Sequence, residues 1–548
     1  MGIKTYLRER LKETIEGFGW IVEGEIELTG PREPSWGDLT TNVAFQIAPQ
    51  VGENPRGVAE RISNGLALSP EFIERAEVAD PGFINFYLAR GELLRSLREI
   101  IERGEEYGRC NLGRGRRVQV EFVSSNPTGP LTVGHGRQAT LGDAVASLLE
   151  WAGYRVEREY YFNDAGNQMM LLGESLQARY EQLFDPSFPF PPDGYKGNYL
   201  LEIAQELREE RGEELRGVPA EEVLPIFMEY ASRRIIVGIR EDLERFGVRF
   251  DLWFKESSLY EEGKVEEAIE ILRGKGHIYE KEGAVWFSSS RLGDERDRVL
   301  VKKGGESTYL ATDIAYHLDK KRRGFDWVID VWGADHWGHV PSMRAAAKAL
   351  GFSDGFLYYL VHQMVSFKKG GAELKMSTRQ GTFITLRQMM EEIGRDVARF
   401  FYLTRGADSH LVFDLDLAKR ESSENPAYYV QYAHARICSI LEYAKKEGLS
   451  PAKEADLSIL REPEEVDLMK KLVWFPETVE GSARSLEPHR ITTYLQDLAS
   501  AFHLFYQRHR VVTKERKLSL ARLILAQASL KVLKNGLRIL GISAPEKM

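Results

Sequence analysis

Hydrophobic and polar residues alternate over 118–122, where the apolar positions are Val118, Val120 and Phe122. This period of two predicts a β-strand. A Pro- and Gly-rich run follows at 126–136. Beyond it, apolar residues recur at helical spacing, at Leu141, Ala144, Val145, Leu148 and Leu149. A second strand is predicted over 155–162, so we expect a β-α-β unit with parallel strands and a right-handed crossover.

The turn in this unit lies at the start of a helix, directly after a strand. Free backbone N–H groups and the positive end of the helix dipole point at any ligand bound there. The segment 126–136 is therefore predicted to bind an anionic group such as a phosphate.

Elsewhere the pattern divides the chain into three predicted domains. Residues 1–110 read as a small α/β domain, with a helix at 5–18, a loop at 31–45, a helix from about 54 and a strand at 82–88. Residues 111–385 carry further strand patterns at 284–288, 298–302, 327–332 and 356–365, and a helical insertion at about 171–250. From 386 to 548 apolar residues keep helical spacing almost without pause. We expect an α/β protein: a parallel-sheet domain with a small α/β domain before it and an all-α bundle after it.

Composition adds limits. The 548 residues are 43% hydrophobic and 29% charged, as in globular proteins. We see no apolar run of the roughly 18–20 residues that a membrane span needs. The opening MGIKTYLRER has no apolar signal-peptide core. With only Cys110 and Cys438, far apart in sequence, reduced thiols and a cytoplasmic location are expected.

Charge is distributed unevenly. The net charge is −9, yet the stretch 505–540 carries nine Lys and Arg residues against a single acid, Glu515. Such clustering suits a local phosphate-binding face, and an ordinary solvated helix surface is the alternative.

Six segments, in order along the chain, resemble the patterns of the arginyl-tRNA synthetase family of class I aminoacyl-tRNA synthetases, in its bacterial form. They are SNPTGPLTVGH (125–135), YFNDAGNQM (161–169), TYLATDIAYH (308–317), GADHWGH (333–339), KMSTRQG (375–381) and NPAYYVQYAHARI (425–437). The resemblance implies a Rossmann-type catalytic domain, a tRNA-contacting N-terminal domain and an anticodon-binding bundle.

The resemblance also implies the reaction and its partners. The carboxylate of L-arginine would attack the α-phosphate of ATP, and the arginyl group of the resulting adenylate would pass to the terminal adenosine of tRNA(Arg). ATP would be used with Mg²⁺, no structural metal is expected, and a monomer is the expected state. Phosphate displacement depends chiefly on positioning and charge stabilisation rather than on a protein nucleophile.

Two signature motifs, TVGH in the turn at 126–136 (the signature turn) and KMSTR at 375–379, supply the expected catalytic and nucleotide-binding groups together with the GADHWGH segment. The residues given a catalytic role by the resemblance are Thr132, His135, Lys375, Ser377 and Arg379. The expected ATP contacts are Pro130, Gly134, His135, Gly333, Asp335, His336 and Met376. Two residues depart from the family pattern: Thr132 stands where His is usual, and Thr378 where a second Lys is usual.

Arginine has to be recognised through its guanidinium, which carboxylates bind in fork geometry. The expected arginine contacts are Glu121, Ser124, Asn126, Tyr309 and Asp313. Tyr309 and Asp313 lie four residues apart and share a helix face. For Glu121 a surface strand position is the alternative. His336 and His339 with Asp335 resemble a metal ligand set, but the sequence offers no fourth ligand.

Transfer RNA contacts are expected at both ends of the chain. In the N-terminal domain the candidates are Trp36, Asn42, Phe83 and Asn85, and in the bundle they are Tyr428, Tyr432 and Arg436. Aromatic residues at helical spacing offer stacking faces for unpaired bases, although such residues are more often part of a core.

Other functions compete with this interpretation. A nucleotidyltransferase outside translation would use the same HxGH turn, but it would not need the two outer domains. A non-catalytic RNA-binding relative would explain Thr132 and Thr378. Specificity for cysteine is disfavoured because that branch needs clustered zinc ligands, which two distant cysteines do not supply.

Overall fold

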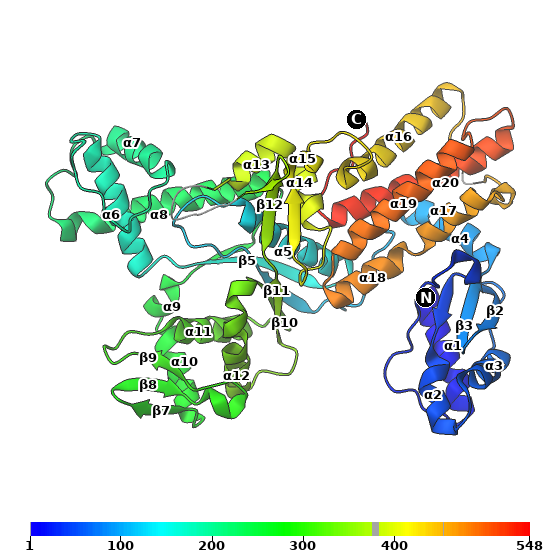
Figure 1. Ribbon diagram of the computed structural model, residues 1–548, viewed down its shortest axis with the longest axis horizontal. Coiled ribbons are helices and arrows are strands. Elements are labelled where there is room, and N and C mark those ends of the chain that lie inside the picture. The colour runs from blue at the N-terminus through cyan, green and yellow to red at the C-terminus, as the bar shows by residue number, and fades with distance from the viewer. Residues whose placement is uncertain (1, 375–382, 453) are drawn as a thin grey trace.

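The computed structural model describes residues 2–374, 383–452 and 454–548. The N-terminal domain lies below a bundle of helices, and the parallel sheet occupies the centre (Figure 1). The helical insertion projects to the far side of the sheet from the bundle. No helix among these residues has the length and apolarity that crossing a membrane requires.

The central sheet has five parallel strands in the order β11-β10-β4-β5-β6. Their bounds are Arg117–Glu121 for β4, Arg155–Phe162 for β5, Leu252–Lys255 for β6, Trp327–Gly333 for β10 and Leu357–His362 for β11. The order reverses between β4 and β10, which is the doubly wound Rossmann arrangement that the sequence predicts. Ligands bind at such a reversal, beyond the carboxyl ends of the strands.

Helix α5 (Val133–Trp151) crosses the sheet between β4 and β5 and is buried along most of its length. Two of its glycines allow close packing. A Cβ at Gly142 would lie 2.2 Å from the ring of Phe122, and one at Gly136 would lie 2.7 Å from the Tyr402 hydroxyl. The helix therefore lies unusually close to its neighbours, which fixes the signature turn at its start.

The insertion and a lower lobe follow β5. The insertion consists of α6 (Asn167–Gln182), α7 (Tyr199–Arg211) and α8 (Ala220–Arg245). The lobe contains α9 (Ser257–Glu261), α10 (Lys264–Gly274), the antiparallel strands β7 (Ile278–Lys281), β8 (Ala284–Phe287) and β9 (Arg298–Val301), α11 (Tyr309–Arg322) and α12 (Val340–Leu350).

A second small sheet corrects two predictions. The expected strand 356–365 is divided, because β11 ends at His362 and β12 (Val365–Lys369) joins β13 (Ala372–Glu373) and β14 (Leu411–Asp414). The expectation of an all-α pattern from 386, with only short breaks, is wrong at β14, which pairs in parallel with β12. The alternating burial of Leu411 and Phe413 follows the period of a strand. Helices α13 (Leu386–Ile393), α14 (Arg395–Tyr402) and α15 (Leu415–Ala418) surround this sheet.

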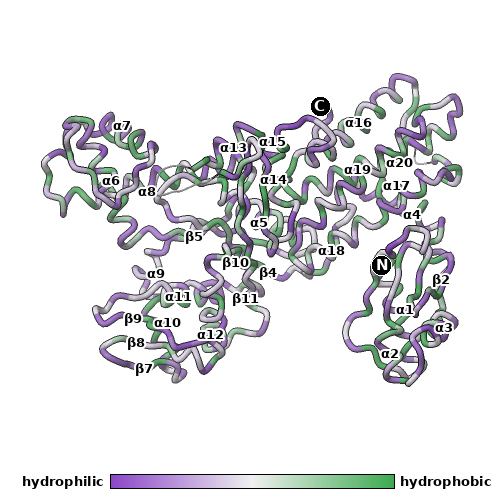
Figure 2. The backbone as a smooth tube through the Cα atoms, in the orientation of Figure 1, coloured by the Kyte–Doolittle hydropathy of each residue, from purple (hydrophilic) through white to green (hydrophobic). Residues whose placement is uncertain are grey.

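Of the two outer domains, the N-terminal one is an antiparallel sheet with helices, and the C-terminal one is a helical bundle. The N-terminal domain has α1 (Ile3–Gly17), α2 (Val43–Val51), α3 (Pro55–Gly65), and strands β1 (Leu39–Thr41), β2 (Ile73–Ala79) and β3 (Phe83–Leu88). The bundle has α16 (Pro426–Lys446), α17 (Pro463–Val473), α18 (Phe475–Ser485), α19 (His489–Arg508) and α20 (Arg516–Ile539). Hydrophobic and hydrophilic stretches alternate along these helices in Figure 2, as they do in amphipathic helices.

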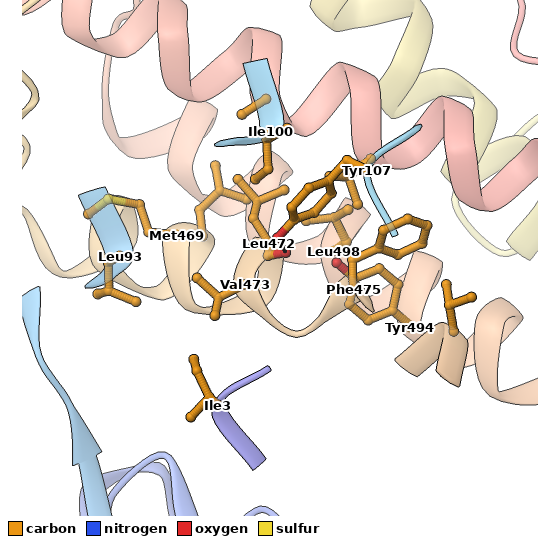
Figure 3. Packing of buried hydrophobic residues seen from close by; sticks show 14 of the residues in the cluster. Ile3, Leu93, Ile100, Tyr107, Met469, Leu472, Val473, Phe475, Tyr494 and Leu498 are labelled. Carbon is orange, nitrogen blue, oxygen red and sulfur yellow. Dashed lines mark hydrogen bonds between the residues drawn. The ribbon is translucent and has the colours of Figure 1, made fainter. Parts of the chain in front are cut away.

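Helix α4 (Arg90–Arg103) connects the N-terminal domain to the bundle. Leu93 and Ile100 of α4 pack with Met469 and Leu472 of α17, and Ile3 lies at the near edge of this cluster (Figure 3). The domains therefore share one hydrophobic core at their junction.

Candidate active site

The reversal of strand order brings three predicted segments to one edge of the sheet. Strand β4 ends at Glu121 and leads into the signature turn, and its neighbour β10 ends at Gly333. Helix α11 begins at Tyr309 and carries Asp313 one turn later. This is the edge at which open α/β sheets bind ligands.

The signature turn fixes the tautomer of His135. Its Nδ1 accepts the backbone N–H of Thr132 at 3.0 Å, so the ring proton resides on Nε2. Burial lowers the pKa of His135 to about 4. His135 is therefore a neutral donor through Nε2 at physiological pH, and Thr132 occupies the N-cap position that orients it.

Gly134 differs from the other glycines at the start of α5. It is exposed, and a Cβ there would meet only the Thr132 hydroxyl, at 3.5 Å. No packing within the described residues requires glycine at this position, unlike Gly136 and Gly142. An open backbone surface beside His135 is what a flat ligand needs for close approach.

The two expected arginine contacts on α11 are accessible. Tyr309 is 69% exposed, and Asp313 is partly exposed. Nε2 of His339 lies 2.8 Å from Oδ2 of Asp313. The carboxylate is thus held in place from one side.

Glu121 is not the open carboxylate that the sequence predicts. It is buried, its Oε2 accepts from Lys320 Nζ at 2.6 Å and its Oε1 accepts from the Ser124 hydroxyl at 2.9 Å. Lys320 also donates to Asp330 at 2.7 Å. Burial raises the pKa of Glu121. Glu121 therefore anchors the loop through Ser124, and its other carboxylate oxygen is already bonded to Lys320.

A second acid, Glu256, interacts electrostatically with Asp313 and was not predicted from the sequence. Glu256 is buried directly after β6 and accepts the Tyr161 hydroxyl at 2.5 Å. Burial first, and then the charge of Asp313, raise the pKa of Glu256 to about 7. The four residues of β6 before this acid, LWFK, do not alternate apolar and polar residues, so no periodicity pointed to it.

The remaining predicted residues of the loop lie around this edge. Asn126 Nδ2 donates to Gln168 Oε1 at 2.8 Å. The side-chain carbonyl oxygen of Asn126 therefore points away from Gln168. Ser124 has a φ of 40° and the preceding Val123 a φ of 69°, so two non-glycine residues adopt the left-handed region. Pro130 borders a cavity of about 660 Å³ that is also lined by residues of the helical insertion.

The GADHWGH segment forms a short 3₁₀ helix, η4 (Ala334–His339), beyond β10. Gly333 pairs in register with His362 of β11, while Asp335 and His336 are exposed. Across residues 2–374, 383–452 and 454–548 no three His, Cys, Asp or Glu side chains are grouped as metal ligands.

Lys375, Met376, Ser377 and Arg379 lie outside the described residues. The chain that follows them returns to the signature turn, because the Val133 N–H donates to the Ile384 carbonyl at 3.1 Å and Thr132 pairs with Thr385. Residues 384 and 385, which follow the predicted segment, therefore lie beside Thr132 and Val133.

The N-terminal tRNA candidates differ in accessibility. Trp36 is 50% exposed, and Phe83 packs beside Phe45 with ring centroids 5.2 Å apart. Asn42 donates to Glu27 at 3.3 Å. Asn85 is only 5% exposed within β3, so its side chain is part of the core and does not reach the surface.

The bundle candidates form one continuous group. The rings of Tyr428 and Tyr432 stack, with centroids 5.9 Å apart, and Arg436 lies 4.6 Å from the Tyr432 centroid. Tyr506 of α19 was not predicted from the sequence. Its ring centroid lies 5.4 Å from the guanidinium carbon of Arg436. Tyr432, Arg436 and Tyr506 line a cavity of about 560 Å³.

The basic stretch 505–540 is not a uniform phosphate-binding face. Arg522 is buried against Glu465 at 2.7 Å, and both Lys534 and Arg538 pair with Glu105. These three cations hold α20 against its neighbours.

Family models match nearly the whole chain. Residues 2–88 match the arginyl-tRNA synthetase N-terminal domain, residues 96–402 the catalytic domain of class I tRNA synthetases (R), and residues 430–548 the DALR anticodon-binding domain.

Known proteins are similar over their full lengths. The arginine–tRNA ligase of Geobacter sp. (strain M21) is 49% identical over 554 residues, covering 100% of both chains. That of Bacillus subtilis (strain 168) is 46% identical over 550 residues, covering 100% of this chain and 99% of its own. The structure of Thermus thermophilus arginyl-tRNA synthetase superposes with a TM-score of 0.82 at 25% identity, covering 100% of each chain. The chain therefore belongs to the arginyl-tRNA synthetase family of class I aminoacyl-tRNA synthetases and is an arginine–tRNA ligase.

Proposed function

We propose that arginine is activated at the reversal of strand order, with its side chain toward α11 and its carboxylate toward the signature turn. ATP, used with Mg²⁺, would lie along the start of α5. The observation that carries this proposal is the convergence of the signature turn, Asp313 and Gly333 at one edge of the sheet. Near-attack positioning is the main contribution that such a site makes to an in-line displacement.

In this proposal Asp313 and Glu256 receive the guanidinium, beside Tyr309. Asp313 is fixed by His339 and Glu256 by Tyr161, so both carboxylates are positioned before arginine binds. A guanidinium presents five N–H donors in a plane, which two carboxylates on either side can accept.

Asn126 would accept from the α-ammonium group through its carbonyl oxygen, since Gln168 takes its amide N–H. Glu121 and Ser124 would act indirectly. Their mutual hydrogen bond, together with Lys320, keeps the loop in its left-handed conformation. Their role is therefore positioning.

The nucleotide side uses His135 and Gly134. The Nε2–H of His135 would donate to a phosphate oxygen, and the bare backbone of Gly134 would lie against adenine. Gly333, Asp335 and His336 would contact the ribose, and Pro130 would border the phosphates. Lys375, Met376, Ser377 and Arg379 are proposed for the β- and γ-phosphates on the family resemblance alone.

Transfer RNA would contact both outer domains. Trp36 and Phe83 offer aromatic rings on the N-terminal domain, with Asn42 beside them in sequence. Tyr428, Tyr432 and Arg436 offer a stacked, cationic surface on the bundle for anticodon bases. Asn85 is not part of this proposal because it is buried.

Arginine-dependent ATP–pyrophosphate exchange, assayed with and without tRNA(Arg), tests the activation step. We expect exchange with arginine in the presence of tRNA(Arg), and none with lysine or citrulline. Exchange that is absent under every condition, or equal for all three amino acids, would contradict the proposal. Light scattering of the same preparation checks the predicted monomer.

A further inference from the structure

Tyr199 and Asp242 make two of the hydrogen bonds that connect the helical insertion to the signature region. The Tyr199 hydroxyl, at the start of α7, donates to the Thr128 carbonyl at 2.5 Å. Asp242, near the end of α8, accepts from Arg387 Nε of α13 at 2.6 Å. Both bonds leave the insertion and end on segments next to the signature turn.

Tyr199 contacts the turn on its strand side. Thr128 lies four residues before Thr132, and a Cβ at Gly129 would lie 3.3 Å from the Tyr199 hydroxyl oxygen. Burial raises the pKa of Tyr199, so the hydroxyl remains a donor. The absence of a side chain at Gly129 therefore leaves room for the Tyr199 ring beside the loop.

Asp242 is connected to the turn indirectly, through Arg387 of α13. It is 3% exposed, and Arg387 lies in the first turn of α13. The N-cap of that helix, Thr385, pairs with Thr132, and the Leu386 N–H donates to the Leu131 carbonyl at 2.8 Å. A shift of α13 would thus be transmitted directly to the residues that flank His135.

The space between these elements is open. A cavity of about 660 Å³ lies between them, lined by Pro130, Thr385 and Arg387 on the signature side and by Tyr199 and Asp242 on the insertion side. Side chains do not pack continuously across this cavity. The two hydrogen bonds therefore have more influence on the distance between the insertion and the signature turn than they would inside a core.

We propose that Tyr199 and Asp242 are positioning residues. They would fix the distance between the insertion and the signature turn, where ATP is proposed to bind. The inference rests on the proposed location of ATP beside Gly134 and His135. Neither residue hydrogen-bonds to Asp313, Glu256 or Asn126, which would contact arginine in the proposed function. Their loss should therefore affect ATP and arginine unequally, which a general loss of structure would not do.

The test measures KM for ATP and for arginine separately, by pyrophosphate exchange in saturating tRNA(Arg). Tyr199→Phe removes one hydroxyl and keeps the ring, and Asp242→Asn removes one charge. We expect each to raise the KM for ATP about 10-fold, with the KM for arginine changed less than about twofold. Thermal midpoints are measured alongside.

Matched controls come from the same insertion. Tyr230→Phe removes a hydroxyl that bonds Glu210, and Glu244→Gln changes an exposed acid on α8. Both should leave the two KM values unchanged. Unchanged KM values for ATP in Tyr199→Phe and Asp242→Asn, or equal increases for both substrates, would overturn the inference. Activity of the unmodified chain in the same assay tests the proposed function separately.

Discussion

Asp313 is the carboxylate on which the proposed guanidinium contact depends most directly. Asp313→Asn keeps the size of the side chain and its bond to His339 but removes the negative charge. Charge-assisted bidentate bonds are among the strongest polar contacts, so we expect the KM for arginine to rise about 100-fold. The KM for ATP should stay within about twofold, as measured by pyrophosphate exchange.

Glu306→Gln is the matched control for this change. Glu306 lies just before α11, and its side chain is 76% exposed and pairs with Lys302. It should leave both KM values unchanged. A normal KM for arginine in Asp313→Asn would remove Asp313 from the arginine site.

Histidine burial predicts a loss of stability in acid. Burial lowers the pKa of His362 from 6.5 to about 4. Between these values the unfolded chain binds more protons than the folded chain, so stability is greatest above pH 6.5 and falls as the pH drops toward 4. His362 alone should cost roughly 2–3 kcal/mol near pH 4.5.

Urea unfolding near pH 7 and near pH 4.5 measures this effect, and His362→Gln, which cannot be protonated, is the informative variant. We expect the variant to lose less stability on acidification than the unmodified chain. His135, with its pKa lowered by burial to about 4, contributes in the same direction and remains in both proteins. Identical losses for the two proteins would contradict the assignment to His362.

Glycine is needed at two positions of helix α5 for different reasons, packing at Gly142 and the proposed ligand access at Gly134. Gly142→Ala would place a methyl group within 2.2 Å of the Phe122 ring, and such overpacking costs about 1–3 kcal/mol. Gly134→Ala meets nothing closer than 3.5 Å and should leave the free energy of unfolding within about 1 kcal/mol. Only Gly134→Ala should raise the KM for ATP, by about 10-fold at unchanged stability.

Denaturant unfolding and pyrophosphate exchange, run on both variants, separate the two reasons. The result that would contradict this account is a Gly134→Ala protein that binds ATP normally. A Gly142→Ala protein as stable as the unmodified chain would contradict the packing argument.

Elements were predictable where their periodicity was long and regular. The β4–α5–β5 unit was expected from sequence and is observed, because its strands and helix carry continuous patterns of two and 3.6 residues. Strands β6 and β14 have only four residues each and escaped notice. Short strands depend on partners such as β5 and β12, which local sequence does not specify.

Across the whole molecule, the N-terminal domain is fixed to the bundle rather than tethered to it. Asp38 pairs with Lys470 at 2.7 Å, and Arg90 donates to the carbonyls of Ser458 and Leu460. Together with the shared core around Leu93, these contacts set the position of Trp36 relative to the bundle. Both proposed tRNA surfaces therefore lie on domains that are joined by a shared core and polar contacts.

Trp36→Ala tests the outer surface at this scale. Stacking of a base on an aromatic ring contributes about 1–3 kcal/mol, so we expect the KM for tRNA(Arg) in aminoacylation to rise about 10-fold. The KM values for arginine and ATP should not change. Ile21→Ala, at a 69% exposed position of the same domain, is the control, and an unchanged KM for tRNA would remove Trp36 from the interface.

The sequence alone determined the order of domains, the Rossmann-type unit and the positions of Gly134, His135 and Asp313, because these follow from local periodicity and contiguous motifs. Only the tertiary structure decided that Lys320 donates to Glu121, that the charge of Asp313 acts on Glu256, that Asn85 is buried and that Tyr199 donates to Thr128. Lys320 and Glu121 are 199 positions apart, and Tyr199 and Thr128 are 71 apart. Contacts at such separations arise from how the elements pack, and no periodicity in the chain encodes which distant side chain fills a given charge or hydrogen-bonding position.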